Sequence, residues 1–102
     1  MNQSDFEVQL KADGFTEIEL QPLAPRPGKG RHRHLFEIRG LVVSGGFVVQ
    51  QQGEPVVYRP GQIFSVAEGE LYDEWIEADG ATVLVGRKFS EARTRRDASG
   101  GT

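Results

Sequence analysis

The sequence contains no cysteine, and this absence removes several kinds of chemistry at once. Disulfide bonds, thiolate metal sites and cysteine nucleophiles are all excluded, so any metal ion would need nitrogen and oxygen ligands. Only two histidines occur in the 102 residues. A metal site in this chain can therefore draw on at most two imidazoles.

Long apolar runs and a positive net charge are absent as well. No apolar stretch approaches the roughly 18 residues of a membrane-spanning helix. The amino-terminal residues carry acids where a signal peptide has basic residues followed by an apolar run. We therefore expect a cytoplasmic protein with no membrane partner. The net charge of -3 offers no general attraction to nucleic acid, so no nucleic-acid partner is expected.

The composition is typical of a soluble globular protein, with 37% hydrophobic and 26% charged residues, and the length suits one hydrophobic core. We expect a single domain over residues 1–88. Residues 89–102 lose apolar periodicity, and we interpret them as a flexible tail. The arginines of this tail, Arg93, Arg95 and Arg96, are interpreted as solvated.

One short helix is predicted near the amino terminus. Phe6 and Leu10 fall on one helical face behind a cap formed by Ser4 and Asp5, which indicates a helix over residues 4–13. The barrel-like part of the chain then begins at about residue 15.

From residue 15 the apolar period changes from helical spacing to two, which is the period of a strand. A connection rich in proline and glycine follows. Beyond it, strand-like runs are predicted at residues 35–43, 46–51, 54–58, 62–66, 70–78 and 81–88. Short strands separated by turns with glycine in the second position are typical of a β-sandwich or barrel. The expected fold is all-β, with a barrel over residues 15–88.

Both histidines lie in the run GKGRHRHLFEIRG, residues 28–40. If this run is extended, His32 and His34 point to the same face, because strand residues two apart share a face. Two converging imidazoles are a usual way to offer nitrogen ligands to a divalent metal. The alternative is a basic loop whose histidines and arginines are solvated.

Carboxylates could complete such a metal site. Glu37 is the nearest in sequence, although its odd offset from His34 turns it to the opposite face unless a bulge intervenes. Glu70, Tyr72 and Glu74 share one face of a later strand and could converge on the same point. A solvated outer face is the alternative for this trio. Two histidines and a carboxylate would suit Fe(II), Mn(II), Ni(II) or Zn(II).

An apolar strip is expected on the other face of the same strand. If Tyr72 points inward, Leu71 and Trp75 point outward. Burial of this strip in a homodimer is its simplest fate. Coverage by the amino-terminal helix is the alternative.

In its order of elements the chain resembles a small single-domain cupin over roughly residues 6–88. The first cupin motif begins with a Gly and a His-x-His. A Glu follows three or four residues later, and a second Gly follows six residues after that. HRH at residues 32–34 matches the two histidines. The second motif contains two glycines around a Pro, followed by a His and an Asn. The matching glycines are Gly45 or Gly46 in the first motif and Gly61 and Gly69 in the second. The resemblance implies a double-stranded β-helix, or jelly roll.

The chain departs from both motifs at named positions. Ile38 or Arg39 stands at the glutamate of the first motif, and Tyr72 stands at the histidine of the second; its proline and asparagine are replaced by Ala67 and Ile76. The subgroup that the chain resembles most is one of short bacterial cupins, with an acid three residues after the second histidine and a His-x-Glu in place of residues 72–74. This likeness implies Glu37 or Glu74 as the carboxylate ligand.

The first hypothesis is a metal-dependent enzyme. His32 and His34, with Glu37 or Glu74, would hold a divalent ion that polarises a small oxygen-bearing substrate. The resemblance implies isomerase, dioxygenase, decarboxylase or cyclase activity, among which the fold does not choose.

Two metal-free hypotheses stand beside it. One is a small-molecule binding module, a sensor or carrier, whose pocket contains both histidines, Tyr72, Glu74 and an aromatic residue such as Phe36 or Phe64. The other is an acid/base site in which His34 and Glu74 exchange protons with a substrate near neutral pH, with Tyr72 as a further catalytic candidate.

Overall fold

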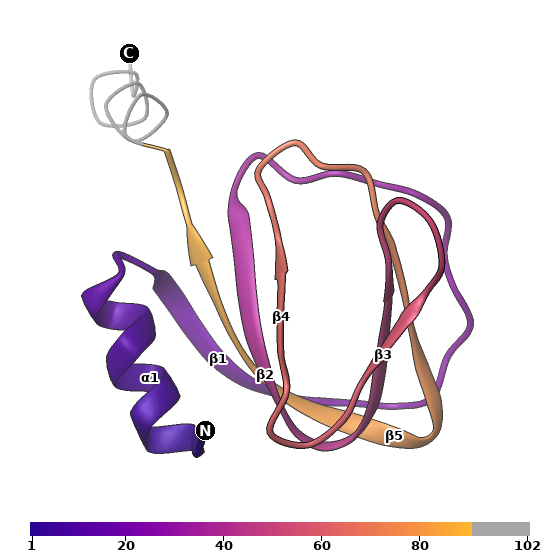
Figure 1. Ribbon diagram of the computed structural model, residues 1–102, viewed down its shortest axis with the longest axis horizontal. Coiled ribbons are helices and arrows are strands. Elements are labelled where there is room, and N and C mark those ends of the chain that lie inside the picture. Colours follow the sequence, from indigo (N-terminus) through magenta and orange to yellow (C-terminus); the bar gives the residue numbers. More distant parts are fainter. Residues whose placement is uncertain (91–102) are drawn as a thin grey trace.

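The computed structural model describes residues 1–90 and contains one helix followed by five strands in that range (Figure 1). The elements are α1 (Gln3–Ala12), β1 (Thr16–Leu23), β2 (Glu37–Gln50), β3 (Val56–Tyr58), β4 (Ile63–Val66) and β5 (Asp73–Lys88). All strand pairs are antiparallel. The all-β class with one amino-terminal helix is therefore confirmed.

The helix begins one residue earlier than predicted because of its cap. Asn2, rather than Ser4 or Asp5, is the capping residue, and its side-chain oxygen accepts a 2.8 Å hydrogen bond from the backbone N–H of Asp5. An asparagine at this position satisfies one of the backbone donors that a helix leaves free at its start. The buried residues of the helix are Phe6 and Leu10, as the spacing predicts.

The long strands β2 and β5 form the spine of the fold. They pair along most of their length, β1 lies on the far edge of β5, and β3 and β4 pair with different halves of β2. Figure 1 shows β2, β3, β4 and β5 surrounding an open frame, with residues 24–36 arching along the side away from the helix. This arrangement closes the sheet into a barrel.

Two pairs of predicted strands are in fact continuous. Residues 35–43 and 46–51 belong largely to β2, and residues 70–78 and 81–88 belong largely to β5. The glycines between them mark bulges, where register shifts bend the strand pair, rather than chain reversals. Gly45 has φ +78°, and a Cβ there would collide with the carbonyl group of Gly80 on the paired strand. Glycine is required at this corner by both conformation and space.

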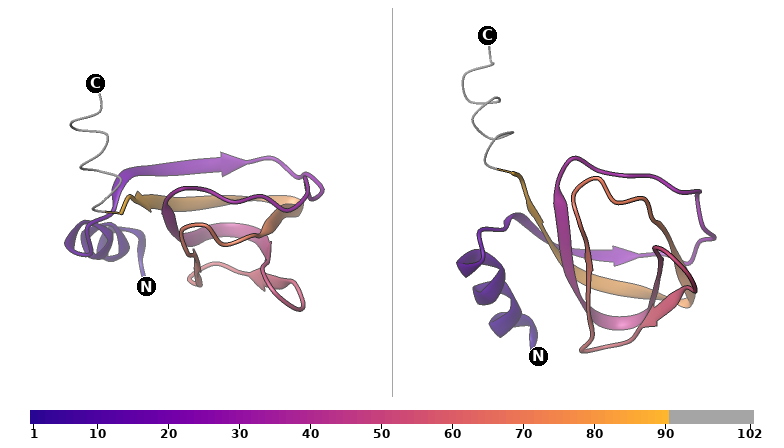
Figure 2. Two further views of the ribbon diagram at one scale, coloured as in Figure 1. Left: turned by 90° about the horizontal axis from the view of Figure 1, so that it is seen from above. Right: turned by 45° about the horizontal axis from the view of Figure 1, so that its top comes forward.

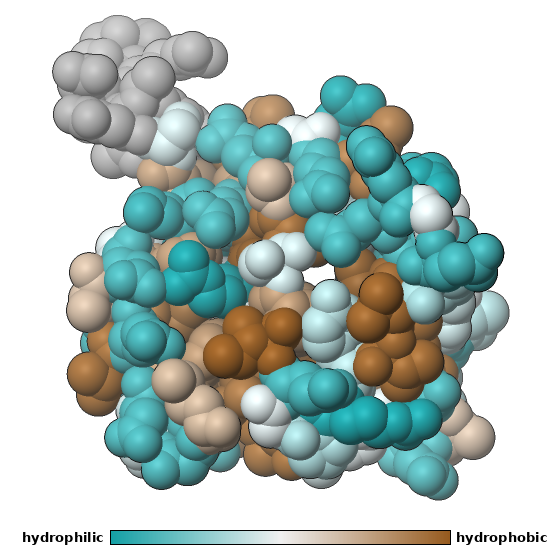
Figure 3. Space-filling model, viewed as in Figure 1, coloured by the Kyte–Doolittle hydropathy of each residue, from teal (hydrophilic) through white to brown (hydrophobic). Residues whose placement is uncertain are grey.

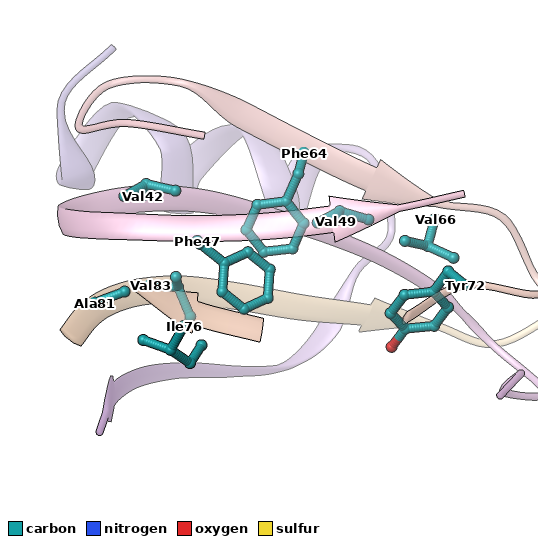
Figure 4. Close-up of a cluster of buried hydrophobic side chains, with 9 residues drawn as sticks. All are labelled: Val42, Phe47, Val49, Phe64, Val66, Tyr72, Ile76, Ala81 and Val83. Carbon is teal, nitrogen blue, oxygen red and sulfur yellow. The ribbon is translucent and has the colours of Figure 1, made fainter. Parts of the chain in front are cut away.

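The buried apolar residues form two groups on opposite faces of the spine. One lines the barrel interior and consists of Val42, Phe47, Val49, Phe64, Val66, Tyr72, Ile76, Ala81 and Val83 (Figure 4). The other lies outside the barrel, where the helix residues Phe6 and Leu10 pack with Phe15 on the directly paired Leu41 and Leu84. Figure 2 shows the helix beside the barrel.

The predicted outer strip is only partly exposed. Leu71 is 41% exposed, whereas Trp75 is partly buried and pairs across the sheet with Val48. The helix packs on Leu41 and Leu84 instead, so its described contacts do not provide the coverage considered as an alternative. Burial of the strip in a homodimer stays a prediction.

Within residues 1–90, the only helix is too short to span a bilayer. The predicted tail lies outside the described residues from residue 91 onward, and with it the three arginines Arg93, Arg95 and Arg96.

Candidate functional site

The barrel encloses a cavity of about 360 Å³. Part of its wall is aliphatic and aromatic, with Phe36, Phe47 and Phe64 among the apolar residues. Figure 3 shows apolar side chains around the hollow at the centre of a mostly hydrophilic face. The polar and charged groups of the lining are Gln21, Arg26, Lys29, His34, Tyr72, Glu74 and Arg87. An apolar pocket with a few converging polar groups is the usual form of a small-molecule site.

Residues 24–36 bring several of these groups to the cavity because the segment is pinned along β5. Arg26 exchanges two backbone hydrogen bonds with Ile76, at 3.2 and 3.0 Å, and His32 exchanges two with Tyr72, at 2.9 and 3.0 Å. The carbonyl of His34 accepts a further bond from the N–H of Gly69 at 2.9 Å. These bonds hold an otherwise irregular, proline-rich segment against the barrel.

Asp73 fixes the loop that carries Lys29. Its Oδ1 accepts hydrogen bonds from the N–H of Lys29 at 3.1 Å and of Glu74 at 2.8 Å. Burial works to raise the pKa of Asp73, but backbone hydrogen bonds from Glu74, Lys29 and Gly30 lower it overall, so the carboxylate stays ionised. Lys29 is thereby anchored beside the cavity through its backbone.

His34 lies in the cavity wall among aromatic rings. Its ring stacks on Phe36 with centroids 4.8 Å apart, and it lies 5.9 Å from the ring of Tyr72. Burial lowers the pKa of His34, the charges of His32, Lys29 and Arg87 lower it further, and Glu74 opposes them. The imidazole is therefore neutral at pH 7, with one nitrogen able to donate and one able to accept.

His32 lies behind His34 rather than in the cavity wall. Its ring centroid is 4.4 Å from that of Tyr72 and 5.3 Å from that of His34. Its Nδ1 lies 3.0 Å from the carbonyl oxygen of Gly30, which can only accept, so Nδ1 carries the proton. Nε2 is a buried ring nitrogen with no hydrogen-bond partner among residues 1–90. The two histidines are neighbours, but of the two only His34 lines the cavity described here.

Tyr72 lies at one end of the interior cluster, at the entrance to β5 (Figure 4). The side chain is 3% exposed. Burial raises the pKa of Tyr72 well above its usual range, and the negative charge of Glu74 raises it further. The phenol therefore keeps its proton and can donate a hydrogen bond.

Glu74 faces the cavity as strand alternation predicts, but it is already engaged. Its Oε1 lies 3.4 Å from Nη2 of Arg26 and 3.8 Å from Nζ of Lys29. Arg26 also donates through Nη1 to the backbone carbonyl of Glu74 at 2.9 Å. This carboxylate balances two cations.

The other predicted acids lie elsewhere. Glu37 is directed away from the cavity, as its odd offset predicts, and its carboxylate lies 3.8 Å from Arg39. Glu70 shares a strand face with Tyr72 and Glu74 in the sequence pattern, but its Oε1 accepts from the N–H of Ala67 at 2.9 Å and closes a turn. Of the predicted pocket residues, Phe36 and Phe64 lie in the cavity wall with Tyr72.

Sequence reasoning missed the three cations of the cavity. The inward direction of Arg87 could have been predicted from the sequence, because Arg87 continues the alternation in which Val83 and Val85 point inward. Arg26 and Lys29 lie in a segment without periodicity, where only the tertiary pairing with β5 shows which side chains turn inward.

Comparison with known proteins places this geometry in a recognised architecture. No family model matches the sequence, and none of the curated proteins compared with it matches either. Solved structures do match. NMB1881 from Neisseria meningitidis has a TM-score of 0.60 at 21% identity, over 74% of each chain. A cupin protein from Bacteroides fragilis has 0.59 at 17%, over 74% of this chain and 66% of that one. A cupin-2 domain protein from Shewanella frigidimarina has 0.57 at 10%, over 67% and 65%.

The chain has the cupin fold. It spans about two thirds of the two cupins named above, and at these identities the likeness concerns the fold alone. The expected cupin jelly roll is thereby confirmed.

The cupin fold implies a divalent metal at the barrel centre, and the residues present here do not fit one. No three side chains from His, Cys, Asp and Glu come together within the described part of the chain. Tyr72 stands in place of a third imidazole and keeps its proton, while Glu74 is paired with cations. The predicted ligand set of His32, His34, Glu37 and Glu74 stays a prediction that this geometry does not favour.

Proposed function

We propose that this cupin-fold protein binds a small organic molecule in its barrel cavity without a resident metal ion. The observation that carries the proposal is the character of the cavity wall. It combines apolar side chains with His34, Tyr72 and a carboxylate that two cations already balance. Such a wall offers hydrogen bonds and apolar contact to a ligand, but it lacks the converging anionic and imidazole donors of a divalent site.

The electrostatics around His34 support the same reading. The charges of Lys29 and Arg87 act on this ring in the direction that disfavours positive charge. A divalent cation at the same place would meet the same repulsion, opposed only by Glu74. A neutral or anionic ligand meets no such penalty.

Metal loading and thermal stability test the proposal together. Purified protein incubated with Fe(II), Mn(II), Ni(II) and Zn(II), then desalted, should retain less than about a tenth of an equivalent of each. Because no ion stabilises the native state, EDTA should leave the Tm unchanged. One equivalent of retained metal, together with a Tm that falls in EDTA and recovers on adding that ion, would contradict the proposal.

Tyr72→His provides the matched comparison, with Tyr72→Phe as the variant that removes the hydroxyl without adding a ligand. Tyr72→His adds a third imidazole within reach of His32 and His34, so we expect it to retain more metal than the wild type, whereas Tyr72→Phe should not. Equal retention by all three proteins would show that position 72 does not decide metal binding.

A further inference from the structure

The cavity carries the opposite charge to the whole chain. Arg26, Lys29 and Arg87 line it against the single carboxylate of Glu74, which leaves an excess of positive charge, whereas the chain as a whole has a net charge of -3. Positive groups gathered in a concave, low-dielectric wall focus their field on its contents. The excess of positive charge in the lining therefore favours an anionic group in the cavity.

Arg87 is the cation with the most unused binding capacity. Its Nη1 lies 3.9 Å from Oε1 of Glu17 and 3.9 Å from Oε1 of Glu19, which is longer than a direct hydrogen bond. Both carboxylates are more than half exposed, and contacts of this kind contribute little. The side chain of Arg87 is only 26% exposed, and its guanidinium lies over the ring of Phe36 at 5.6 Å. The guanidinium is thus held at the cavity, and its N–H donors remain available to a ligand.

Lys29 supplies a second available cation. Its Nζ is 3.8 Å from the Glu74 carboxylate, which Arg26 already contacts at 3.4 Å. The loop that carries Lys29 is fixed through Asp73. Lys29 can therefore turn toward a ligand without leaving Glu74 unpaired.

The remaining wall requires an apolar ligand body. Phe36, Phe47 and Phe64 line the cavity with valine, leucine and isoleucine side chains. The rings of Phe47 and Phe64 lie 4.7 Å apart. The volume of about 360 Å³ corresponds to about a dozen liquid waters at roughly 30 Å³ each, which suits a compact molecule.

We propose that the ligand is a small organic carboxylate with a compact apolar body. Its carboxylate pairs with the guanidinium of Arg87 and the ammonium of Lys29, and its body packs against the phenylalanine side chains. This inference rests on the proposed metal-free binding function and adds the chemical class of the ligand. An arginine fork is the group best suited to two parallel hydrogen bonds with a carboxylate.

Matched acids and amides test the charge of the ligand. Benzoate and phenylacetate would be titrated against benzamide and phenylacetamide, which have nearly the same shape without the charge. Protein treated with EDTA would be observed by amide-resolved NMR at pH 7. The acids should shift signals of the cavity strands with millimolar or tighter Kd, and the amides should bind at least about tenfold more weakly. Amides that bind as well as the acids, or acids that cause no shift at about 10 mM, would overturn the inference.

Inorganic phosphate separates the anionic group from the apolar body. It offers oxyanions to Arg87 and Lys29 but no surface to the phenylalanines, so it should bind at least about tenfold more weakly than phenylacetate. Phosphate binding as tight as that of the acids would overturn the assignment of an organic ligand.

Arg87→Gln and Lys29→Gln test the residues. Each should weaken phenylacetate binding about tenfold, and Arg87→Lys should fall between wild type and Arg87→Gln because it keeps the charge without the fork. Arg59→Gln is the matched control, since Arg59 is 58% exposed and pairs with Glu77 on the surface; it should bind like the wild type. Unchanged binding in both cavity variants would overturn the assignment.

The two proposals fail in different ways. If the acids bind only after Zn(II) or Mn(II) is added to EDTA-treated protein, the metal-free function is wrong. If metal-free protein prefers the amides, the function stands and the carboxylate class is wrong.

Discussion

His34 shows how one buried residue reports on the charges around it. Its ring stacks on Phe36 in the cavity wall. Burial and the neighbouring cations act together to lower its pKa, and only Glu74 opposes them. The ionisation of His34 is therefore a sensitive measure of the positive character of the cavity.

The His34 ring should titrate below its ordinary value of 6.5 in the folded protein, which NMR of the imidazole nitrogens can measure. Replacing the opposing carboxylate, in Glu74→Gln, should lower this pKa further, whereas Arg87→Gln should raise it. Opposite shifts, or none, would contradict the electrostatic picture of the site.

The same shift has a consequence for stability. Well above pH 6.5 the imidazole is neutral in both the folded and the unfolded chain and has no effect on the free energy of unfolding. As the pH falls below 6.5, the unfolded chain takes up the proton first, so His34 lowers the free energy of unfolding. His34→Gln should reduce this acid-side loss in urea unfolding measured between pH 7 and pH 5.

At the scale of elements, the paired strands β2 and β5 bend at their bulges. A glycine at such a bulge lies close to the paired strand, whereas a glycine in an open turn need not. Gly45 and Gly53 both have positive φ, +78° and +81°. A Cβ at Gly45 would collide with the Gly80 carbonyl, whereas a Cβ at Gly53 meets nothing within 4 Å. Comparing Gly45 with Gly53 therefore separates the cost of a positive φ from the cost of close approach between strands.

Gly53→Ala should cost about 1–3 kcal/mol of unfolding free energy from its positive φ alone. Gly45→Ala carries the same conformational cost and adds a backbone collision, so it should be clearly more destabilising. Chemical denaturation of the two variants measures the difference. Equal losses would mean that the barrel corner can relax around a methyl group.

At the scale of the whole molecule, the two apolar groups share their strands. Val42 belongs to the barrel interior and the preceding Leu41 to the layer under the helix. Because β2 takes part in both, we expect the interior and the helix layer to unfold in one cooperative transition.

Phe6→Ala tests this coupling, because Phe6 of the helix is only 1% exposed and packs on the sheet. The variant should lose about 3–5 kcal/mol, as typical for a buried phenylalanine, with a single transition seen by both circular dichroism and Trp75 fluorescence. Val8→Ala on the same helix, where Val8 is 68% exposed, should change stability by no more than about 0.5 kcal/mol. Two separate transitions would show that the helix layer is independent of the barrel.

The sequence by itself determined the all-β class, the amino-terminal helix and the common face of Tyr72 and Glu74 at the start of β5. These follow from local periodicity, since alternation within one strand needs no knowledge of its partners. The same alternation placed Glu37 on the face opposite to His34.

Only the tertiary structure decided what meets in the cavity. Each of the two long strands is continuous, because the glycines between its halves form bulges that bend the paired strands. The sequence did not show this, since a glycine turn signal is the same for a bulge and for a chain reversal. Arg26 and Lys29 reach the barrel because an irregular segment is hydrogen-bonded to β5, and Arg87 joins them from the far end of that strand. Local patterns assign side chains to faces, but long-range pairing brings those faces together.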